Sequence, residues 1–309
     1  MIVGVMSDPG FRIRPASRDD FATIERIAAA NDEPTTAPRW PGYLYLDHLL
    51  AEAALLVAER GGAVVGYAGA AVVGGRHPAA HVTDLFVDPA VHGQGVGKHL
   101  LRGLQLEVDA PAWTTSSSAD PRALTLYVRA GMQPLWPVLY LDLPLGLPAP
   151  DIRGDAWPGG RPSSRQLDPG SASAIELAWS GRDFAVQYRH WASRPGGLAF
   201  AVEVDGRPVA VGAVRDGRIG PGRVLDHLAI APDTDPVAAL VAALWSTAVR
   251  ISPPEPAPEA RLTFALPGPH PAVAFVLRNG CRITDHDTFC ASDPDLVDPA
   301  RTVPDPSFG

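Results

Sequence analysis

The sequence predicts an α+β protein built from two tandem domains, and three observations lead to this prediction. The chain has 309 residues, whereas ordinary domains run to roughly 100–200 residues. Hydrophobic residues make up 46% of it and charged residues 19%, which is typical of a globular chain with buried cores. The third observation is that segments of the first half recur in the same order in the second half.

The first half opens with a strand and two helices. Residues 11–14 alternate between apolar and polar side chains and predict a strand. A helix with apolar residues at helical spacing follows from Asp19, and residues 43–54 form a second helical stretch. Strands are then expected at 55–59, 63–73 and 82–87.

The rest of the first half alternates helices with strands. Residues 95–108 predict an amphipathic helix and residues 112–116 a short strand. Residues 121–130 predict a helix, with Pro121 suited to its first turn. An extended segment at 132–143 follows, so the order is β-α-α-β-β-β-α-β-α-β.

The second half repeats this plan. Three pairs of segments correspond: 205–210 with 61–66, 225–232 with 82–89, and 272–280 with 123–131. We interpret the chain as a duplicated domain, with a first domain at 1–145 and a second domain at 162–292. A linker rich in Pro and Gly is expected at 146–161, and a polar, loosely ordered tail at 293–309.

Composition and charge argue against several functions. The net charge of −8 is spread over both halves, and no basic stripe marks a nucleic-acid partner. No apolar stretch approaches the roughly 20 residues of a membrane span, and the N-terminus lacks a signal-peptide pattern, so a cytoplasmic protein without a membrane partner is expected. The scattered histidines have no regular ligand spacing, so no metal is expected. Cys281 and Cys290 are interpreted as buried thiols, although a hairpin could pair them.

A glycine-spaced loop, His92-Gly93-Gln94-Gly95-Val96-Gly97, precedes the helix at 95–108. Backbone N–H groups at a helix start lack partners and point where the helix dipole is positive, which predicts an anion site. The glycines allow a phosphate to approach the backbone closely, and Lys98 adds a charge. The spacing fits neither a dinucleotide-binding loop nor a P-loop. On this motif alone, a helix entrance without a ligand stays open.

The surroundings of the loop resemble the acetyl-CoA-binding signature of the GCN5-related N-acetyltransferases (GNAT). The family's core is Gln/Arg-x-x-Gly-x-Gly/Ala, and here it is His92-x-x-Gly95-x-Gly97, so the first position departs. The resemblance is strong over residues 11–145. Over 162–292 it is weak and rests on the internal repeat.

A second family signature, Asn-x-x-Ala-x-x-x-Tyr-x-x-x-Gly-Phe, is similar to residues 120–132. Asp120 replaces its asparagine and Met132 its phenylalanine. The resemblance implies two tandem GNAT-like domains, each a mixed, mostly antiparallel twisted sheet flanked by helices in α/β/α layers. It also implies acetyl-CoA as co-substrate and a small-molecule primary amine as the acceptor that attacks it directly.

The resemblance implies a set of cofactor-binding residues on the strand before the loop, in the loop and in the following helix. They are Leu85, Phe86, Val87, His92, Gly93, Gln94, Gly95, Val96, Gly97, Lys98, Asp120 and Tyr127. The strand is expected to splay from its neighbour, so that the pantetheine arm pairs with the backbone around Leu85 and Val87, where an N–H stabilises the oxyanion.

The resemblance also implies catalytic roles. Tyr127 is expected to protonate the departing thiolate, and the alternative is a core tyrosine. A general base must take the acceptor's proton, and Asp84 and His81 are both candidates. Asp32 and Glu33 could bind a cationic acceptor or could simply be solvated.

The second domain lacks this equipment. Residues 232–237 replace the glycine loop, contain no glycine and place two aspartates where phosphates would bind. Val276 stands in the place of Tyr127. We therefore expect no CoA there and a structural role: completing a sheet, covering the first site or forming a homodimer face.

Some alternatives stay open at this point. Four residues could line an acceptor pocket between the domains or lie in the core: Trp179, Tyr188, His190 and Trp191. The chain could also be a regulatory module that binds acetyl-CoA without turnover, or a protein or peptide N-acetyltransferase.

Overall fold

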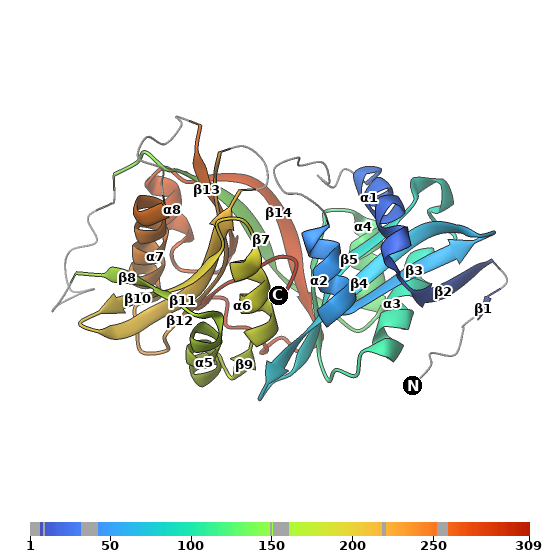
Figure 1. Cartoon of the computed structure of the whole chain (residues 1–309), viewed down its shortest axis with the longest axis horizontal. Coiled ribbons are helices and arrows are strands. Elements are labelled where there is room, and N and C mark those ends of the chain that lie inside the picture. The colour runs from blue at the N-terminus through green and yellow to red at the C-terminus, as the bar shows by residue number, and fades with distance from the viewer. Residues whose placement is uncertain are drawn as a thin grey trace.

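The computed structural model describes residues 7–8, 10–31, 43–148, 150, 161–217, 221–251 and 259–309. Most of the predicted linker, residues 151–160, lies outside this set, as do Asp32 and Glu33. Figure 1 shows two layered halves side by side along the long axis of the molecule. We keep the names first and second domain for the two repeats.

Every helix and strand predicted for the first domain is present. Its elements are β1 (Ser7–Asp8), β2 (Phe11–Pro15), α1 (Phe21–Ala29), α2 (Leu44–Glu52), β3 (Ala54–Arg60), β4 (Ala63–Gly75), β5 (Ala79–Val87), α3 (Val96–Glu107), β6 (Trp113–Ser117), α4 (Pro121–Arg129) and β7 (Gln133–Pro144), with short 3-10 turns at Arg18–Asp20 and Pro89–Val91.

The second domain follows the same order, except that it lacks a counterpart of β1 and has two short extra strands. Its elements are β8 (Ser163–Leu167), α5 (Pro169–Ser180), β9 (Arg182–Asp183), α6 (Ala185–Ser193), β10 (Leu198–Val204), β11 (Arg207–Asp216), β12 (Gly222–Ile230), α7 (Pro236–Ile251), β13 (Arg261–Pro267), α8 (Val273–Arg278), β14 (Arg282–Ala291) and β15 (Thr302–Val303). The extra strands are β9 and β15.

The two domains share one continuous sheet and exchange their last strands. The strand order is β1-β2-β3-β4-β5-β6-β14-β7-β13-β12-β11-β10-β8. Strand β14 of the second domain pairs with β6 of the first, and β7 of the first pairs with β13 of the second, both antiparallel. Strands β7 and β14 also pair with each other at the centre of Figure 1. The repeat boundary near residue 145 is therefore not a boundary of the sheet.

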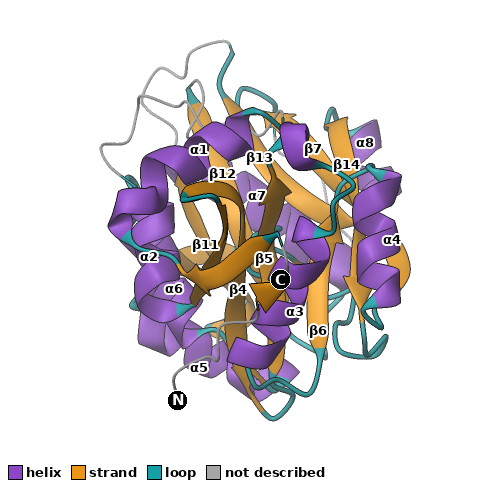
Figure 2. Cartoon of the chain, turned by 90° about the vertical axis from the view of Figure 1, so that its right-hand side faces the viewer, coloured by secondary structure: helices purple, strands orange, loops and turns teal. Residues whose placement is uncertain are grey.

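Helices cover both faces of the first domain's sheet, as Figure 2 shows. On one face, Ile24 of α1 and Leu49 of α2 pack in a cluster with Val57 and Tyr67. On the other, Leu100 of α3 belongs to a cluster that contains neighbouring strand residues such as Ala58 and Ala68. Because adjacent strand residues point to opposite faces, the two clusters form separate layers.

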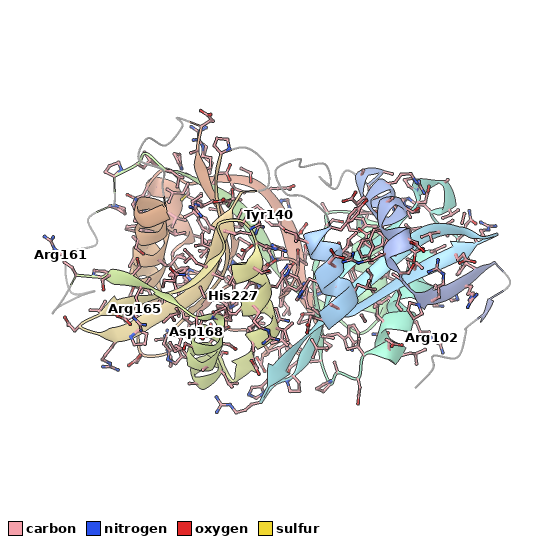
Figure 3. The ribbon with its side chains drawn as sticks, in the orientation of Figure 1. Arg102, Tyr140, Arg161, Arg165, Asp168 and His227 are labelled. Carbon is pink, nitrogen blue, oxygen red and sulfur yellow. The ribbon has the colours of Figure 1, made fainter. Side chains whose placement is uncertain are left out.

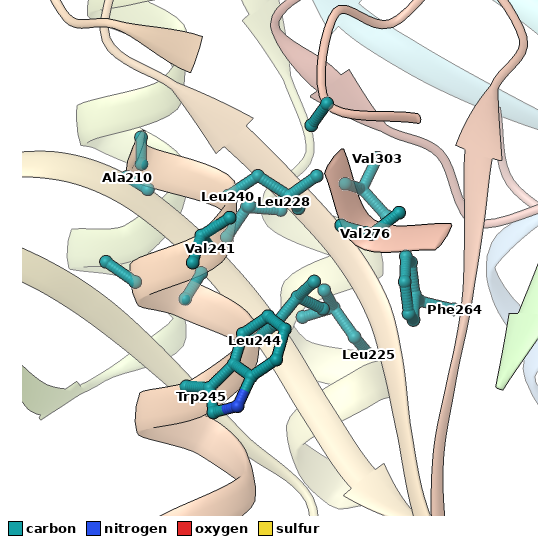
Figure 4. Close-up of a cluster of buried hydrophobic side chains, with 14 of the residues drawn as sticks. Ala210, Leu225, Leu228, Leu240, Val241, Leu244, Trp245, Phe264, Val276 and Val303 are labelled. Atoms are coloured by element: carbon teal, nitrogen blue, oxygen red, sulfur yellow. The ribbon is translucent and has the colours of Figure 1, made fainter. Parts of the chain in front are cut away.

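The second domain has its own core and also extends the first one. Leu240, Leu244 and Trp245 of α7 pack on the sheet, as drawn in Figure 4. Phe184, which immediately precedes α6, and Trp191 of α6 join the cluster on the α1 and α2 side of the first domain. The two domains are thus continuous through a shared apolar layer as well as through the sheet.

The prediction of a loosely ordered tail at 293–309 is wrong. Strand β15 pairs with β12, and the Phe308 side chain is fully buried. Trp191 Nε1 donates a 2.7 Å hydrogen bond to Asp305 Oδ2. The polar, Pro-rich composition gave no sign of these partners because they come from elements far away in the chain.

Three further observations concern the described residues as a whole. None of their helices is long and apolar enough to cross a membrane. They contain no group of three or more His, Cys, Asp or Glu side chains placed to hold a metal ion. Cys281 and Cys290 are free and buried, so the hairpin disulfide considered above is not formed.

Candidate active site

Strands β5 and β6 run parallel but separate soon after they begin. Their pairing covers only Ala80–Val82 and Trp113–Thr115. Beyond this point β5 continues to Val87 while pairing with β4 on its other side. Beyond Val82 and Thr115 the facing edges of β5 and β6 are therefore not paired with each other, and we call this unpaired stretch, which leads toward the loop at 92–97, the gap.

The register of β5 against β4 shows which backbone groups face this gap. Asp88 N donates to Val65 O at 2.9 Å, and hydrogen-bonded pairs alternate along an antiparallel ladder. Phe86 therefore directs its backbone to β4, while Leu85 and Val87 direct theirs into the gap. Of the three predicted strand residues, Leu85 can offer its N–H and carbonyl to an extended ligand and Val87 its N–H, because Val87 O already contacts His92 Nε2 and Asn31 Nδ2. Phe86 offers neither group.

The loop at 92–97 presents backbone donors at the start of α3. Gly93 and Gly95 have φ values of 77° and 84°, in the left-handed region that favours glycine. Gly95 is the N-cap of α3, makes no side-chain cap, and is followed by a first turn without acidic residues. A Cβ on Gly97 would lie 3.2 Å from Leu85 Cδ2, so this glycine lets α3 approach β5. The first-turn N–H groups are left to an anion.

Both nitrogens of the His92 ring make contacts that fix the loop in place. Its Nε2 lies 2.8 Å from Val87 O, and Arg122 Nη1 lies 3.0 Å from its Nδ1. Because a carbonyl only accepts and a guanidinium only donates, the neutral tautomer protonated on Nε2 satisfies both contacts. The ring replaces the family's Gln/Arg as a support for the loop, and only the backbone of His92 remains for a ligand.

Two charged side chains beside the loop are exposed, Lys98 and Arg122. Arg122 also pairs with Asp120 at 2.8 Å, and Asp120 caps α4 by accepting a 2.8 Å hydrogen bond from Arg122 N. The Asp120 carboxylate is therefore occupied, and its pKa is lowered chiefly by Arg122. Sequence reasoning missed Arg122 as a site residue, although its place in the first turn of α4 was a usable signal.

The predicted residue Gln94 is tied to the end of β3. Its Oε1 accepts a 2.6 Å hydrogen bond from Arg60 Nη1. Val96, two residues further on, is buried in the α3 core and offers only its backbone.

Tyr127 lies on α4 in the core beneath the gap, in a cluster with Val82 and Leu100. Burial raises the pKa of its phenol well above the usual range, and a hydrogen bond with Thr115 opposes this in part. Thr115 Oγ1 in turn donates to Val82 O at 3.1 Å. The phenol therefore stays protonated at neutral pH, close to where β5 and β6 diverge.

Asp84 follows a β-bulge in β5. Gly69 pairs with Asp84 and Ala70 with Val82, so Thr83 is the extra residue. Tyr45 of α2 donates a short hydrogen bond to Asp84 Oδ2, and Thr83 Oγ1 donates to the same oxygen at 3.0 Å. Burial raises the pKa of Asp84, while these two hydrogen bonds lower it. The second oxygen, Oδ1, is left for another donor.

The absence of a side chain at Gly69 leaves room for Thr83 and Leu49 beside Asp84. A Cβ there would lie 2.4 Å from Thr83 Oγ1 and 3.2 Å from Leu49 Cδ1. Any other residue would therefore displace the side chains that surround Asp84. The sequence reading missed both Gly69 and Tyr45, since only the register and the packing of α2 bring them to Asp84.

His81 does not have the geometry of a base. Its Nδ1 lies 2.8 Å from Thr114 Oγ1, and its Nε2 lies 3.0 Å from Pro306 O in the tail. Burial lowers the pKa of the ring to about 4. Both ring nitrogens are engaged, so His81 joins the tail to β5. It has no free lone pair with which to take a proton from an amine.

The second domain has the same bulge with different residues. Ala213 pairs with His227 and Val214 with Leu225, so His227 stands where Asp84 stands in the first domain. The His227 ring is fully buried and stacks on Trp191 at 5.1 Å between centroids, within the second domain of Figure 3. It contacts Glu176 Oε1 at 2.9 Å, and Tyr188 donates to Glu176 Oε2 at 2.9 Å. Tyr188, His190 and Trp191 are thus buried core residues, which is one of the two roles that the sequence left open for them.

The chain itself fills the gap of the second domain. Strands β12 and β13 pair only over residues 222–225 and 261–264. Beyond this, Leu228 and Ala229 pair with β15, and Ile230 N donates to Arg301 O at 2.9 Å. These positions correspond to those that face the open gap in the first domain.

The loop before α7 is also closed to an anion. Asp235 Oδ1 accepts a 2.8 Å hydrogen bond from Ala238 N and so caps the helix. The Arg301 guanidinium binds Ala231 O and Thr234 O across the same loop.

Comparisons with known proteins agree with this geometry. Residues 21–132 match the model of the acetyltransferase (GNAT) family. No curated protein matches the sequence. A protein from Pyrococcus horikoshii described as a putative acetyltransferase has a similar structure, with a TM-score of 0.69, 15% identity and 98% of each chain covered.

Two further structures are similar over nearly their whole length. A tandem GNAT protein from the clavulanic acid biosynthesis pathway has a TM-score of 0.58 and 18% identity, with 92% of this chain and 99% of that chain covered. A GCN5-related N-acetyltransferase from Sphaerobacter thermophilus has a TM-score of 0.56 and 17% identity, with 98% and 99% covered. At these identities the likeness shows the fold.

The structure has the fold of tandem GNAT proteins. The match to the GNAT acetyltransferase family lies within the first domain, and the second domain has the same fold without the glycine loop.

Proposed function

We propose that the chain is an acetyl-CoA-dependent N-acetyltransferase that acetylates the primary amine of a small molecule. One observation carries the proposal: the open gap between β5 and β6 joins an uncapped helix start at one end to Tyr127 and Asp84 at the other. A phosphate-bearing ligand with an extended arm would fit such a path.

The described residues fit acetyl-CoA. The loop backbone at 93–97 would hold the pyrophosphate, with Lys98 and Arg122 supplying positive charge nearby. The backbone groups of Leu85 and Val87 that face the gap would pair with the amides of the pantetheine arm. When bound, acetyl-CoA supplies an activated acetyl thioester.

Three groups of the chain would then carry the transfer. Asp84 accepts a proton from the acceptor ammonium and so frees the nitrogen lone pair. A backbone N–H of the β5 edge donates to the thioester carbonyl oxygen and stabilises its negative charge. As the C–N bond forms and the C–S bond breaks, the nitrogen releases its second proton to solvent and Tyr127 gives its proton to the sulfur. Solvent returns a proton to Tyr127 and removes one from Asp84.

The decisive experiment combines binding with turnover. Isothermal titration with acetyl-CoA should give one site per chain, and a library of primary amines should release free CoA thiol. Binding with no thiol release from any amine would favour the regulatory module instead. Absence of acetyl-CoA binding would overturn the proposal.

Tyr127→Phe tests the acid role. We expect turnover to fall about 10²-fold or more, because the sulfur then leaves without a proton donor, while acetyl-CoA affinity stays near wild type. Steady-state kinetics and titration calorimetry on the same preparation separate the two effects. Wild-type turnover of this variant across the pH range would show that Tyr127 is a core residue only.

A further inference from the structure

The C-terminal segment runs from the second domain into the first. After β15 it forms a tight turn, in which Phe308 N and Gly309 N donate to Asp305 O at 3.0 and 2.8 Å. The Asp305 carboxylate accepts from Trp191 Nε1 at 2.7 Å, which ties the turn to α6. Pro306 O contacts His81 Nε2 at 3.0 Å, which ties it to β5.

The turn lies on the face of the sheet that carries Asp84. His81 pairs with Ala71 and Asp84 with Gly69, and because these partners are two residues apart they share one face. The bulge at Thr83 is what brings His81 and Asp84 to the same side. A segment bound to the His81 ring therefore lies beside Asp84.

Phe308 links the turn to the Asp84 carboxylate through Tyr45. Its side chain is fully buried, and its ring centroid lies 6.0 Å from that of Tyr45, in an edge-to-face arrangement. Tyr45 in turn donates its hydroxyl proton to Asp84. Phe308, Tyr45 and Asp84 thus form a contiguous row, apolar at one end and anionic at the other.

The polar neighbours of this row do not oppose a cation. His48 and His190 stack on each other at 3.9 Å and both contact Phe308. Burial lowers the pKa of His48 to about 4 and of His190 to about 2, so both rings are neutral at neutral pH. The nearby Arg194 guanidinium faces Asp226 at 3.6 Å. Asp226 and Asp305 oppose the positive charge of Arg194, which also acts on Tyr45 and both histidines.

We propose that residues 304–309 form a wall of the acceptor site and that Phe308 is a specificity-determining residue. The inference rests on the proposed function, because it takes Asp84 as the group that receives the amine. The acceptor's ammonium binds at the Asp84 carboxylate, and its carbon body is bounded by the partly exposed Tyr45 ring, which the fully buried Phe308 ring supports from behind. The wall restricts the acceptor to a small primary amine with a short apolar body, and excludes a polypeptide from this side.

The test measures kcat/KM for straight-chain and aryl-alkyl primary amines of increasing size, with acetyl-CoA saturating. Wild type should prefer the smallest amines. Phe308→Ala should raise the ratio of kcat/KM for large over small amines by about 10-fold or more, because the Tyr45 ring loses its support and can move away from the acceptor. Phe308→Leu keeps an apolar core residue, should fold if Phe308→Ala does not, and should give an intermediate ratio. The KM for acetyl-CoA should stay within about 2-fold of wild type in both.

Phe264→Ala is the matched control. Phe264 is an equally buried phenylalanine in the core of the second domain, so its loss destabilises the fold without touching the wall. Its amine ratio should equal that of wild type.

The outcomes separate this inference from the proposed function. If wild type releases thiol and the Phe308 variants, folded by circular dichroism, keep its amine ratio, the wall is refuted and the acetyltransferase stands. If wild type already acetylates large and small amines equally, the wall is also refuted. If no amine releases thiol with wild type, the proposed function fails first and takes the inference with it.

Discussion

The two domains share a fold and a bulge, yet one keeps a site open and the other closes it. In the first domain the bulge presents Asp84, a helix start is uncapped, and β5 and β6 leave a gap. In the second domain the bulge presents His227 beneath Trp191, Asp235 caps the helix, and β15 fills the gap. Each feature of the first site has a counterpart that the second domain satisfies from within the chain.

This difference teaches that the fold supplies the same backbone geometry in both domains. Whether a domain can bind a ligand depends on whether its own side chains and strands already fill that geometry. The splayed strands and the helix start recur in both domains because they follow from the order of elements. Unpaired backbone groups in such places need partners, from the chain or from a ligand. The second domain uses its own tail and aspartate, whereas we propose that the first leaves these groups to acetyl-CoA. Matched substitutions in the two domains can test this comparison.

The largest difference in turnover is expected between the variants Asp84→Asn and His227→Asn. Asp84→Asn should lower turnover by about 10²–10⁴-fold, since an amide cannot accept the acceptor's proton. His227→Asn should keep turnover but lower the free energy of unfolding by about 1–3 kcal/mol, because Glu176 loses a buried partner. Kinetics and urea unfolding of both variants check this. Equal losses of turnover would mean that the two bulges are not functionally different.

A second comparison places alanine at two glycines of the same backbone conformation. Gly95 has φ 84° in the first domain, and Gly206 has φ 75° in a hairpin turn of the second. Each change costs about 1–2 kcal/mol of backbone strain. Only Gly95→Ala should also weaken acetyl-CoA binding, by about 10-fold or more, because strain at this positive φ displaces the first-turn N–H groups of α3 that would bind the anion. Calorimetric titration of both variants measures this, and similar losses of affinity would refute the anion site.

A third comparison removes the hydroxyl of Tyr45 or of Tyr188. The Tyr45 hydrogen bond lowers the pKa of Asp84, so Tyr45→Phe should raise it. Because the base works when deprotonated, activity is lost as pH falls through that pKa, and the acidic limb of the kcat/KM profile should move to higher pH. Turnover within the limb should fall several-fold. Tyr188→Phe, which removes a donor to Glu176, should leave the limb in place. A limb unmoved by Tyr45→Phe would argue against Asp84 as the base.

The smallest expected effect comes from uncapping the second helix start. Asp235→Ala should lower the free energy of unfolding by about 1 kcal/mol, the usual cost of a lost N-cap. The acetyl-CoA stoichiometry should remain one per chain, because β15 still occupies the gap. Two bound molecules in a titration of this variant would show that the cap alone had closed the second site.

The sequence by itself determined the repeat, the order of elements and the glycine loop. These features depend on local periodicity, on glycine at positive φ, and on helix caps, which neighbouring residues dictate. Tyr127 and Asp84 became candidates through the resemblance to the family's signatures, and their roles are part of the proposed function. The missing glycines of residues 232–237 likewise predict that the second domain binds no cofactor.

Only the tertiary structure decided how the two repeats meet. The exchange of β7 and β14, the burial of Phe308, and the contact of Tyr45 with Asp84 all join residues far apart in the chain. The same holds for His81, a plausible base in the sequence that holds the tail in the structure. Backbone hydrogen bonds and apolar contacts form with whichever partner the fold brings near, so local composition does not encode them.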